Sequence, residues 1–389
     1  MMTNDSETVL LAVTGMSPAV LTETVWALAT EAEPVAPQRV VVVTTTEGKA
    51  AMERDLFTPL AAWGGQTVWQ TLRDSVQQRL GLAASEPVLN FEPVRVFTIP
   101  DPKSGRATEL ADLRTRSDND FAADFLLEQV RGLVENPDTH VIASLAGGRK
   151  TMGALLYACL TLVGRGTDRL THVLVNEPYD TVPGFWYPGQ PGGTLIRPAR
   201  GKSAAIRVEP ADATVELADV PFVPLRNLFL RELGQPAGTF RRLMDLCRTN
   251  IRRSAGEHLQ IEIDRSRPET RINGRRLELA PREQLVLLFF AERAKRGDIV
   301  LSAYDEVLND LEEARIAFRA EAPPKNWSDW RHSSSLNRKL DERDLTRVLS
   351  DIRRKAKQAG GDAAFLADVL PERGRVALDV PGPVIFIKP

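Results

Sequence analysis

A chain of 389 residues, of which 43% are hydrophobic and 26% are charged, is long enough for two or three domains with buried cores. No apolar run has the length of a membrane span and the N-terminus lacks a basic signal-peptide start, so we expect a cytoplasmic protein without membrane contact. The two cysteines and four scattered histidines do not have the spacing of a disulfide framework or a zinc site, so we expect no metal and no cofactor.

The net charge of −2 hides an uneven distribution along the chain. From Phe240 onward, lysine and arginine outnumber aspartate and glutamate, whereas the acidic residues prevail before it. A basic C-terminal part permits contact with nucleic acid without requiring it.

The first half of the chain alternates short β-branched runs with helical patterns, which is typical of a parallel sheet with crossover helices. Strands are predicted over residues 8–13, 39–44, 94–98, 140–144 and 171–175, and helices over residues 22–31, 48–60, 118–136 and 151–163. A doubly wound α/β sheet binds its ligand at the carboxyl ends of the strands. The loops at residues 14–17, 44–47, 99–116, 145–150 and 176–187 are therefore expected on one edge.

The second half changes character after residue 198, where a weak pattern predicts a connector with a helix near residues 240–252. Two strands joined by a turn at Asn273 and Gly274 precede a helix that begins at Pro281. Further helices are predicted over residues 304–318, 333–340 and 345–359, and VALDVPGPVIFIK predicts a terminal hairpin. This order is similar in outline to the winged helix-turn-helix effector domains of response regulators. We therefore predict domains over residues 1–200, 201–257 (the connector) and 258–389.

A basic run lies where such a domain has its recognition helix, and it favours contact with DNA. The alternative is that the basic run forms an ordinary solvated helix face, because acidic residues that could pair with it are close in sequence. These are Asp341, Glu342, Asp344 and Asp351. The basic run consists of Arg338, Lys339, Arg343, Arg347, Arg353, Arg354, Lys355 and Lys357.

The run VIASLAGGRKTMG at residues 141–153 predicts an anion site, most simply for phosphate. It is a strand that ends in Gly147 and Gly148 at a helix start, where free N–H groups, Arg149 and Lys150 are available together. It lacks the first glycine of a nucleotide-triphosphate P-loop. A tight turn with two solvated cations is the alternative interpretation.

Two further segments belong to the same predicted edge. TGMSP at residues 14–18 follows the first strand and supplies the Ser17 hydroxyl, although Ser17 is also a plausible helix-entry residue. The segment DLRT at residues 112–115 precedes a helix for which Asp118 is the expected N-cap. Its loop carries a surplus of arginines that suits phosphate recognition, namely Arg106, Arg114 and Arg116.

Several ordered blocks between residues 8 and 230 resemble the CRISPR-associated Rossmann fold (CARF) family, and more closely its ring nuclease subgroup. They are TGMSPAVLTETVWAL, VVVTTTEGK, DLRTRSDNDFAADF, SLAGGRKTMG, DRLTHVLVNEPYD, FWYP and PFVPLRNLF. The expected fold is accordingly a doubly wound, Rossmann-like α/β sheet with a smaller C-terminal winged helix-turn-helix domain.

The resemblance implies a homodimer that binds a cyclic oligoadenylate, usually cyclic tetra-adenylate, across its two-fold axis and cleaves it to end antiviral signalling. It also implies that Ser17 and Lys150 are the catalytic residues. The predicted ligand contacts are Thr14, Gly15, Met16, Thr45, Thr46, Arg114, Thr115, Ala146, Gly147, Gly148, Arg149, Thr151, Met152 and Asn176.

Cleavage of this kind uses an adenosine 2′-OH as the nucleophile, so the protein needs to orient the ribose and stabilise charge on phosphorus, without a metal. We expect no histidine near either loop, and hence slow turnover. Two alternatives remain. One is a ring-sensing transcriptional regulator, and the other is a ring-activated ribonuclease of the HEPN type, for which Arg253 and His258 have the right spacing although Gly256 interrupts them.

Overall fold

The computed structural model of the chain describes residues 7–100, 106–199, 204–229, 239–257, 259–322 and 329–389. The chain divides into two compact units, Met1–Met244 and Asp245–Pro389, and helix α6 (Phe240–Glu257) contains the boundary between them. Among the described helices, none combines the length and the apolar character that crossing a membrane requires.

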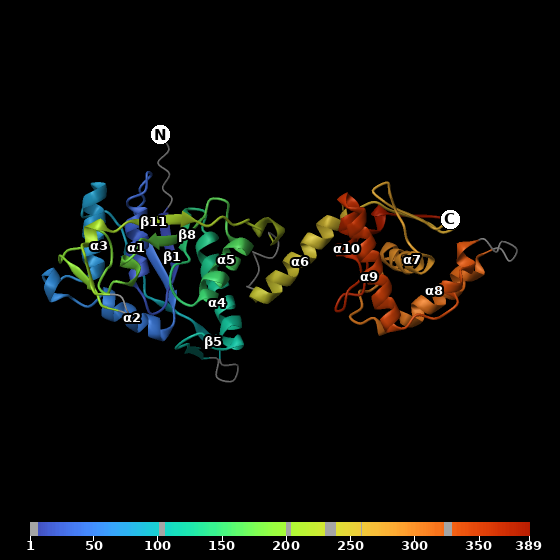
Figure 1. The fold of residues 1–389 in the computed structure, drawn as a ribbon, viewed down its shortest axis with the longest axis horizontal. Helices are drawn as coiled ribbons and strands as arrows, with labels where there is room; N and C mark the ends of the chain where they lie inside the picture. Colours follow the sequence, from blue (N-terminus) through green and yellow to red (C-terminus); the bar gives the residue numbers. More distant parts are fainter. Residues whose placement is uncertain (1–6, 101–105, 200–203, 230–238, 258, 323–328) are drawn as a thin grey trace. The chain divides into compact units, whose positions relative to one another are not determined.

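In its described residues, the first unit is built on one large sheet that is flanked by helices (Figure 1), and it also contains small antiparallel strand pairs. The sheet strands are β1 (Glu7–Val13), β2 (Arg39–Thr44), β3 (Asn90–Phe91), β4 (Arg95–Val96), β7 (Thr139–Ser144), β8 (Arg169–Val175) and β11 (Val215–Asp219). The helices are α1 (Ala19–Leu28), α2 (Thr46–Leu56), α3 (Val68–Leu80), α4 (Arg116–Val134) and α5 (Lys150–Val163). The small pairs are β5 (Thr98–Pro100) with β6 (Ala107–Glu109), and β9 (Leu195–Arg197) with β10 (Ile206–Val208).

The sheet has the order β11-β8-β7-β1-β2-β3, with β4 also paired to β2. All of its pairs are parallel except the edge pair of β11 with β8. From β1 the chain runs outward to β2, β3 and β4, and then returns to β7 on the other side of β1. The point between β1 and β7, where the winding direction reverses, is the topological switch point at which such sheets bind ligands.

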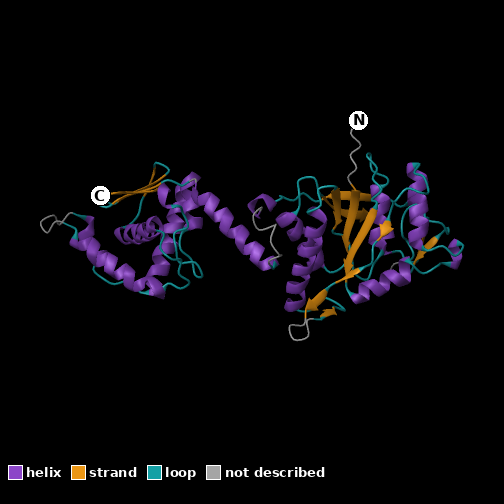
Figure 2. Ribbon diagram, turned by 180° about the vertical axis from the view of Figure 1, so that it is seen from behind, coloured by secondary structure: helices purple, strands orange, loops and turns teal. Residues whose placement is uncertain are grey.

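Both faces of the sheet are covered by helices, as expected for a doubly wound fold (Figures 1 and 2). Leu10 and Val40 of the sheet pack in one core cluster with Leu28 of α1, Met52 of α2 and Leu72 of α3. Helices α4 and α5 pack on each other, α4 against β7 and α5 against β1. The predicted α/β class with a mainly parallel sheet is confirmed.

In its described residues, the second unit combines a four-stranded sheet with most of α6 and four further helices, of which the last is short. Its strands are β12 (Ile261–Asp264), β13 (Glu269–Ile272), β14 (Arg275–Leu277) and β15 (Ile385–Lys388), in the order β14-β13-β12-β15. Its helices after α6 are α7 (Pro281–Arg296), α8 (Leu308–Ala320), α9 (Glu342–Ala359) and α10 (Leu366–Val369). The predicted turn between β13 and β14 is present, with φ values of 47° at Asn273 and 76° at Gly274.

The structure corrects the sequence-based elements in three places. The expected terminal hairpin does not form, because Val376 bridges to Leu301 while β15 pairs in parallel with β12. The helix expected over residues 333–340 is reduced to short 3-10 turns, of which the last ends at Leu336, where the Leu336 carbonyl accepts a hydrogen bond from Arg315 Nη1 at 2.6 Å. The strand expected over residues 94–98 divides into β4 and β5, which pair with different partners.

Several elements were missed, among them helix α3 and strand β11. Helix α3 begins with a reciprocal capping box between Thr67 and Gln70 and ends at Gly81 in the left-handed region, so its start and stop signals were present in the sequence. Strand β11, within the predicted connector, is an antiparallel edge strand of the main sheet. The domain bounds at residues 200 and 257 stay predictions.

Candidate functional site

The candidate site lies at the switch point of the main sheet. Residues 14–18, called here the serine loop, follow β1, and residues 145–149, the glycine loop, follow β7. Because β1 and β7 are parallel neighbours with Ala12 opposite Ser144, both loops leave the sheet at the same edge. This is the edge on which the sequence analysis placed them.

The two loops touch through their glycines. A Cβ added at Gly15 would lie 2.9 Å from the Cα of Gly148, and one added at Gly147 would lie 3.0 Å from Thr14 Oγ1. Gly147 and Gly148 also have φ values of 98° and 69°, in the left-handed region that favours glycine. The backbones therefore meet at a distance that side chains would prevent. The role of these residues in ligand binding stays a prediction.

The start of α5 presents unpaired donors and one free cation. Lys150 is the first residue of the helix and is exposed, and its ammonium has no partner among the described residues. The backbone N–H groups of Gly147, Gly148, Lys150 and Thr151 likewise find no acceptor in the described part of the chain. A helix N-terminus with such donors attracts anions.

Ser17 is exposed and does not cap the following helix. The N-cap position of α1 is Pro18, without a side-chain capping bond, so the helix-entry interpretation of Ser17 is wrong. Only the Ser17 carbonyl is engaged, as acceptor for Thr14 Oγ1 at 3.5 Å. The Ser17 hydroxyl is therefore available to a ligand, and the neighbouring Met16 side chain is 59% exposed.

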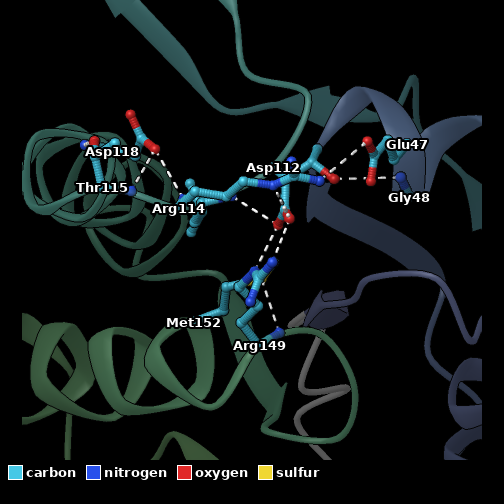
Figure 3. Close-up of polar contacts among 10 residues, drawn as sticks. Glu47, Gly48, Asp112, Arg114, Thr115, Asp118, Arg149 and Met152 are labelled. Atoms are coloured by element: carbon cyan, nitrogen blue, oxygen red, sulfur yellow. Dashed lines mark hydrogen bonds and ion pairs between the residues drawn. The ribbon is translucent and has the colours of Figure 1, made fainter.

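Arg149 and Arg114 share one carboxylate, that of Asp112 (Figure 3). Arg149 Nε donates to Asp112 Oδ1 at 2.6 Å, its Nη2 donates to Oδ2, and Arg114 Nε donates to Oδ2 at 2.9 Å. Hydrogen bonding from Arg149 holds the pKa of Asp112 well below its ordinary value. Arg114 also lies 3.9 Å from Glu47 Oε1. These two predicted ligand cations are thus partly neutralised by the protein itself.

Two predicted contact residues have capping roles. Thr45 Oγ1 accepts a hydrogen bond from Gly48 N at the start of α2, and Thr115 Oγ1 accepts one from Asp118 N at the start of α4. The N-cap of α4 is therefore Thr115, and the expectation that Asp118 would be the cap is corrected. The Asp118 side chain completes the reciprocal capping box from the third helical position.

The remaining predicted contacts are distributed around these loops. Asn176 Oδ1 accepts from Thr214 N at 2.8 Å and Met152 Sδ accepts from Arg149 N at 3.3 Å. Ala146 is buried, and its N–H donates to Ser144 Oγ at 3.3 Å. Thr46 donates its backbone N–H to Leu110. The roles of these residues in ligand binding stay predictions.

A cavity of about 350 Å³ adjoins the two loops, and sequence reasoning missed most of it. Ser17 and Gly147 line it together with Glu23 of α1, His172 of β8 and Asp180. The expectation that no histidine lies near either loop is therefore wrong, and the argument for slow turnover that rested on it no longer holds. Glu23 stands within an apolar helix, which was the available signal of its burial.

Glu23 is the unusual group in this cavity. It is only 7% exposed, and burial, together with the nearby Asp180, raises the pKa of its carboxyl to about 7. In the described part of the chain, no group of three or more His, Cys, Asp and Glu side chains has the arrangement of a metal site.

Comparison with known proteins gives a family and a number of distantly similar solved structures, two of which are described here. Among curated proteins no match is found. The chain is similar to Csm6 of Enterococcus italicus bound to cyclic hexa-2′-fluoro-hexa-dAMP, with 12% identity and a TM-score of 0.22 over 90% of this chain and 56% of that one. It is also similar to a type III CRISPR defence DNA nuclease activated by cyclic oligoadenylate, with 14% identity and a TM-score of 0.21 over 94% and 46%. The chain thus spans about half the length of either protein.

The model of the family described as CRISPR-associated protein NE0113 (Cas_NE0113) matches residues 17–251, which is more than half of the chain. The match begins at Ser17 and includes α1, the glycine loop and α5. On this ground the chain belongs to the CRISPR-associated NE0113 family.

Proposed function

We propose that this protein is a CARF-type ring nuclease that binds a cyclic oligoadenylate, cyclic tetra-adenylate in the first instance, and opens it. The observation that carries the proposal is the contact between the serine loop and the glycine loop at the switch point, beside Lys150, for which the described part of the chain offers no partner. Membership of a CRISPR-associated family and the block resemblance to ring nucleases support the choice of ligand.

The proposed reaction is an in-line transesterification. The 2′-oxygen of one adenosine attacks the adjacent phosphorus, the bond from phosphorus to the 5′-oxygen breaks, and the proton lost from the 2′-OH is balanced by one gained at the 5′-oxygen. The products are a 2′,3′-cyclic phosphate and a 5′-OH. Both nucleophile and leaving group belong to the substrate, so the reaction as proposed needs no metal.

Each part of the site has a role in this reaction. Lys150 and the free N–H groups of the glycine loop stabilise the charge that develops on the phosphoryl oxygens. The Ser17 hydroxyl orients the ribose or the phosphate. Because the described residues of one chain form one such site, a homodimer would present two to a ring that lies across its two-fold axis.

The test is incubation of the purified protein with labelled cyclic tetra-adenylate in EDTA, followed by separation of ring and linear products. We expect linear products that end in a 2′,3′-cyclic phosphate. A ring that stays intact after hours at excess protein would refute the enzymatic proposal. Rings of four and six adenylates, compared side by side, give the preferred size, and light scattering on the same sample gives the oligomeric state.

A second candidate function, a ring-sensing DNA-binding regulator, is favoured by one face of α9. Arg343, Arg347 and Lys357 are exposed, spaced at helical intervals, and without partners among the described residues, and Arg354 lies between them. The other members of the basic run are engaged, for example Lys355 with Glu283 at 2.6 Å and Arg338 with Asp344 at 2.7 Å. The strand and helix order of the second unit suits the proposed winged helix.

Fluorescence anisotropy with duplex DNA, with and without the ring, tests this second function. Reversing the charge at Arg343 and Arg347 is expected to abolish binding, and wild-type affinity is expected to fall steeply with salt. Arg267→Glu, at an exposed arginine in the turn between β12 and β13, is the matched control. Absence of DNA binding in both ligand states would eliminate the regulator.

The ribonuclease alternative depends on Arg253 and His258. Arg253 belongs to α6, and His258 lies outside the described residues.

A further inference from the structure

The reaction proposed above uses only two residues of the cavity beside the serine loop, Ser17 and Gly147. Besides Ser17 and Gly147, its walls come from α1, β8 and the segment between β8 and β9. Its volume of about 350 Å³ lies at the lower end of the range of roughly 300–1,000 Å³ that is typical of small-molecule sites. A group the size of one nucleoside matches this space better than a whole ring does.

Glu23 lines this cavity without a hydrogen-bond partner. Its side chain is more than nine-tenths buried, and no described residue donates a hydrogen bond to its carboxyl. A buried polar group that remains unpaired costs free energy. A ligand that supplied the missing partner would recover that cost, so the geometry points to a polar group bound against Glu23.

Part of the cavity lining is aromatic and held by contacts within the protein. The rings of Tyr179 and Phe185 are 5.1 Å apart, and the Tyr179 hydroxyl donates to Glu209 O at 2.8 Å. Trp186 also lines the cavity, and its carbonyl accepts a hydrogen bond of 2.6 Å from Thr22 Oγ1 of α1. Aromatic side chains in a cavity suit the flat face of a nucleobase.

The charged residues that line the cavity indicate that a base, and not a phosphate, binds there. Glu23, Asp180 and Asp55 line it, no lysine or arginine is among its described lining residues, and the Asp55 carboxylate is held by Arg54 at 2.6 Å. Such an acidic cavity repels phosphate, whereas the start of α5 attracts it. A nucleotide with its phosphate near Lys150 and its base in the cavity would match both the positive start of α5 and the acidic cavity.

We propose that this cavity binds one adenine base of the ligand, with the Glu23 carboxyl paired to the N6 amino group and to the ring nitrogen next to it. The identity of the ligand rests on the proposed function. Adenine presents a donor beside an acceptor on this edge, and a protonated carboxyl presents the complementary acceptor and donor. An ionised carboxylate offers acceptors only, and would leave the ring nitrogen unpaired.

Burial supports the protonated form. The pKa of Glu23 is raised to about 7 by burial and by Asp180, which favours the protonated carboxyl far more than an exposed glutamate does. The other titratable groups that face the cavity are Asp180, His172 of β8, Asp55 of α2 and Tyr179, whose hydroxyl is bonded to Glu209 O. Adenine binding is therefore expected to weaken as pH rises through the pKa of Glu23.

The test measures binding by calorimetry between pH 6 and 8.5 with cyclic tetra-deoxyadenylate, which lacks the attacking hydroxyl and stays intact. Wild-type affinity should fall roughly tenfold or more over this range as the carboxyl ionises. Glu23→Gln keeps an acceptor and a donor at all pH values, so the affinity of this variant should change by no more than about twofold over the same pH range. Glu23→Leu should weaken binding roughly tenfold or more, because both hydrogen bonds are lost. Glu128→Gln, on an exposed part of α4, is the matched control.

Adenosine monophosphate, followed by NMR, is the second probe and separates this inference from the proposed function. If the ring is cleaved and Glu23→Leu binds both probes as the wild type does, the base site is refuted while the nuclease proposal stands. If Glu23-dependent binding of the monophosphate is found but no ring is bound or cut, the base site stands and the nuclease proposal falls. If the wild type binds neither probe, both are refuted.

Discussion

The guanidinium of Arg149 binds both oxygens of the Asp112 carboxylate, with Nε 2.6 Å from Oδ1, although the two residues are 37 positions apart. This ion pair joins the glycine loop to the loop that precedes α4 (Figure 3). Arg149 and Lys150 are adjacent in sequence, yet the first is paired within the protein while the second has no described partner. The two cations should therefore contribute very differently to catalysis.

Replacement of Lys150 by alanine should slow ring cleavage by roughly 100-fold or more, the scale of losing one preorganised charge stabiliser. Replacement of Arg149 by alanine should cost no more than about fivefold, the scale of an exposed ion pair. Single-turnover cleavage of labelled cyclic tetra-adenylate measures both. Equal losses for the two variants would contradict the assignment of Lys150 as the free cation of the site.

Substitution of Gly15 by alanine should destabilise the first unit by more than about 1 kcal/mol, since the new Cβ would lie 2.9 Å from the Cα of Gly148. Ring binding should weaken as well, because the two loops would have to separate. Gly132→Ala in α4 is the control, as its Cβ would meet nothing within 4 Å. That change should stabilise by about 0.5–1 kcal/mol. Urea unfolding of the full chain measures both, and an unaffected Gly15→Ala protein would contradict the close contact.

Ser17 and Thr115 are both hydroxyl residues at the site edge, but only the second caps a helix. Thr115→Ala should lower the free energy of unfolding by about 1 kcal/mol because the bond to Asp118 N is lost. Ser17→Ala should leave stability unchanged, since its hydroxyl has no partner among the described residues, and should slow cleavage roughly tenfold or more. A Ser17→Ala protein with full cleavage activity would remove Ser17 from the catalytic machinery.

The sequence predicted the loops well and the cavity poorly, for physical reasons. The ends of β1 and β7 follow from local signals, namely β-branched runs that stop at glycines, and parallel strands bring their ends together. Glu23 gave only a weak signal, the apolar helix around it, because a single acidic residue in a short helix ordinarily faces solvent. Its burial depends on residues far along the chain, such as Trp186, whose carbonyl is bonded to Thr22. Contacts of that kind cannot be read from local pattern.

The same limit applies to the predicted cations. A loop rich in arginine suggests an anion site when each residue is considered alone. In the folded chain Asp112 binds the guanidinium group of Arg114 from this loop and that of Arg149 from the glycine loop, and only the three-dimensional arrangement reveals this. Lys150, in contrast, remains without a described partner, as the anion-site interpretation requires.

Glu23 should also make the stability of the protein depend on pH. Its pKa is raised in the folded state, from the ordinary 4.5 to about 7, because burial disfavours the charged form. The folded state therefore holds a proton that the unfolded state releases, so this contribution is fully present below pH 4.5 and is lost as pH rises through about 7. Glu23→Gln does not titrate and escapes the loss. Relative to wild type, it should gain about 2–3 kcal/mol in the free energy of unfolding between pH 4.5 and pH 8. Urea unfolding at both pH values measures the difference, with Glu128→Gln subtracting the general effect of removing one acidic side chain. A constant difference between Glu23→Gln and wild type would mean that Glu23 is ionised in the folded protein at ordinary pH.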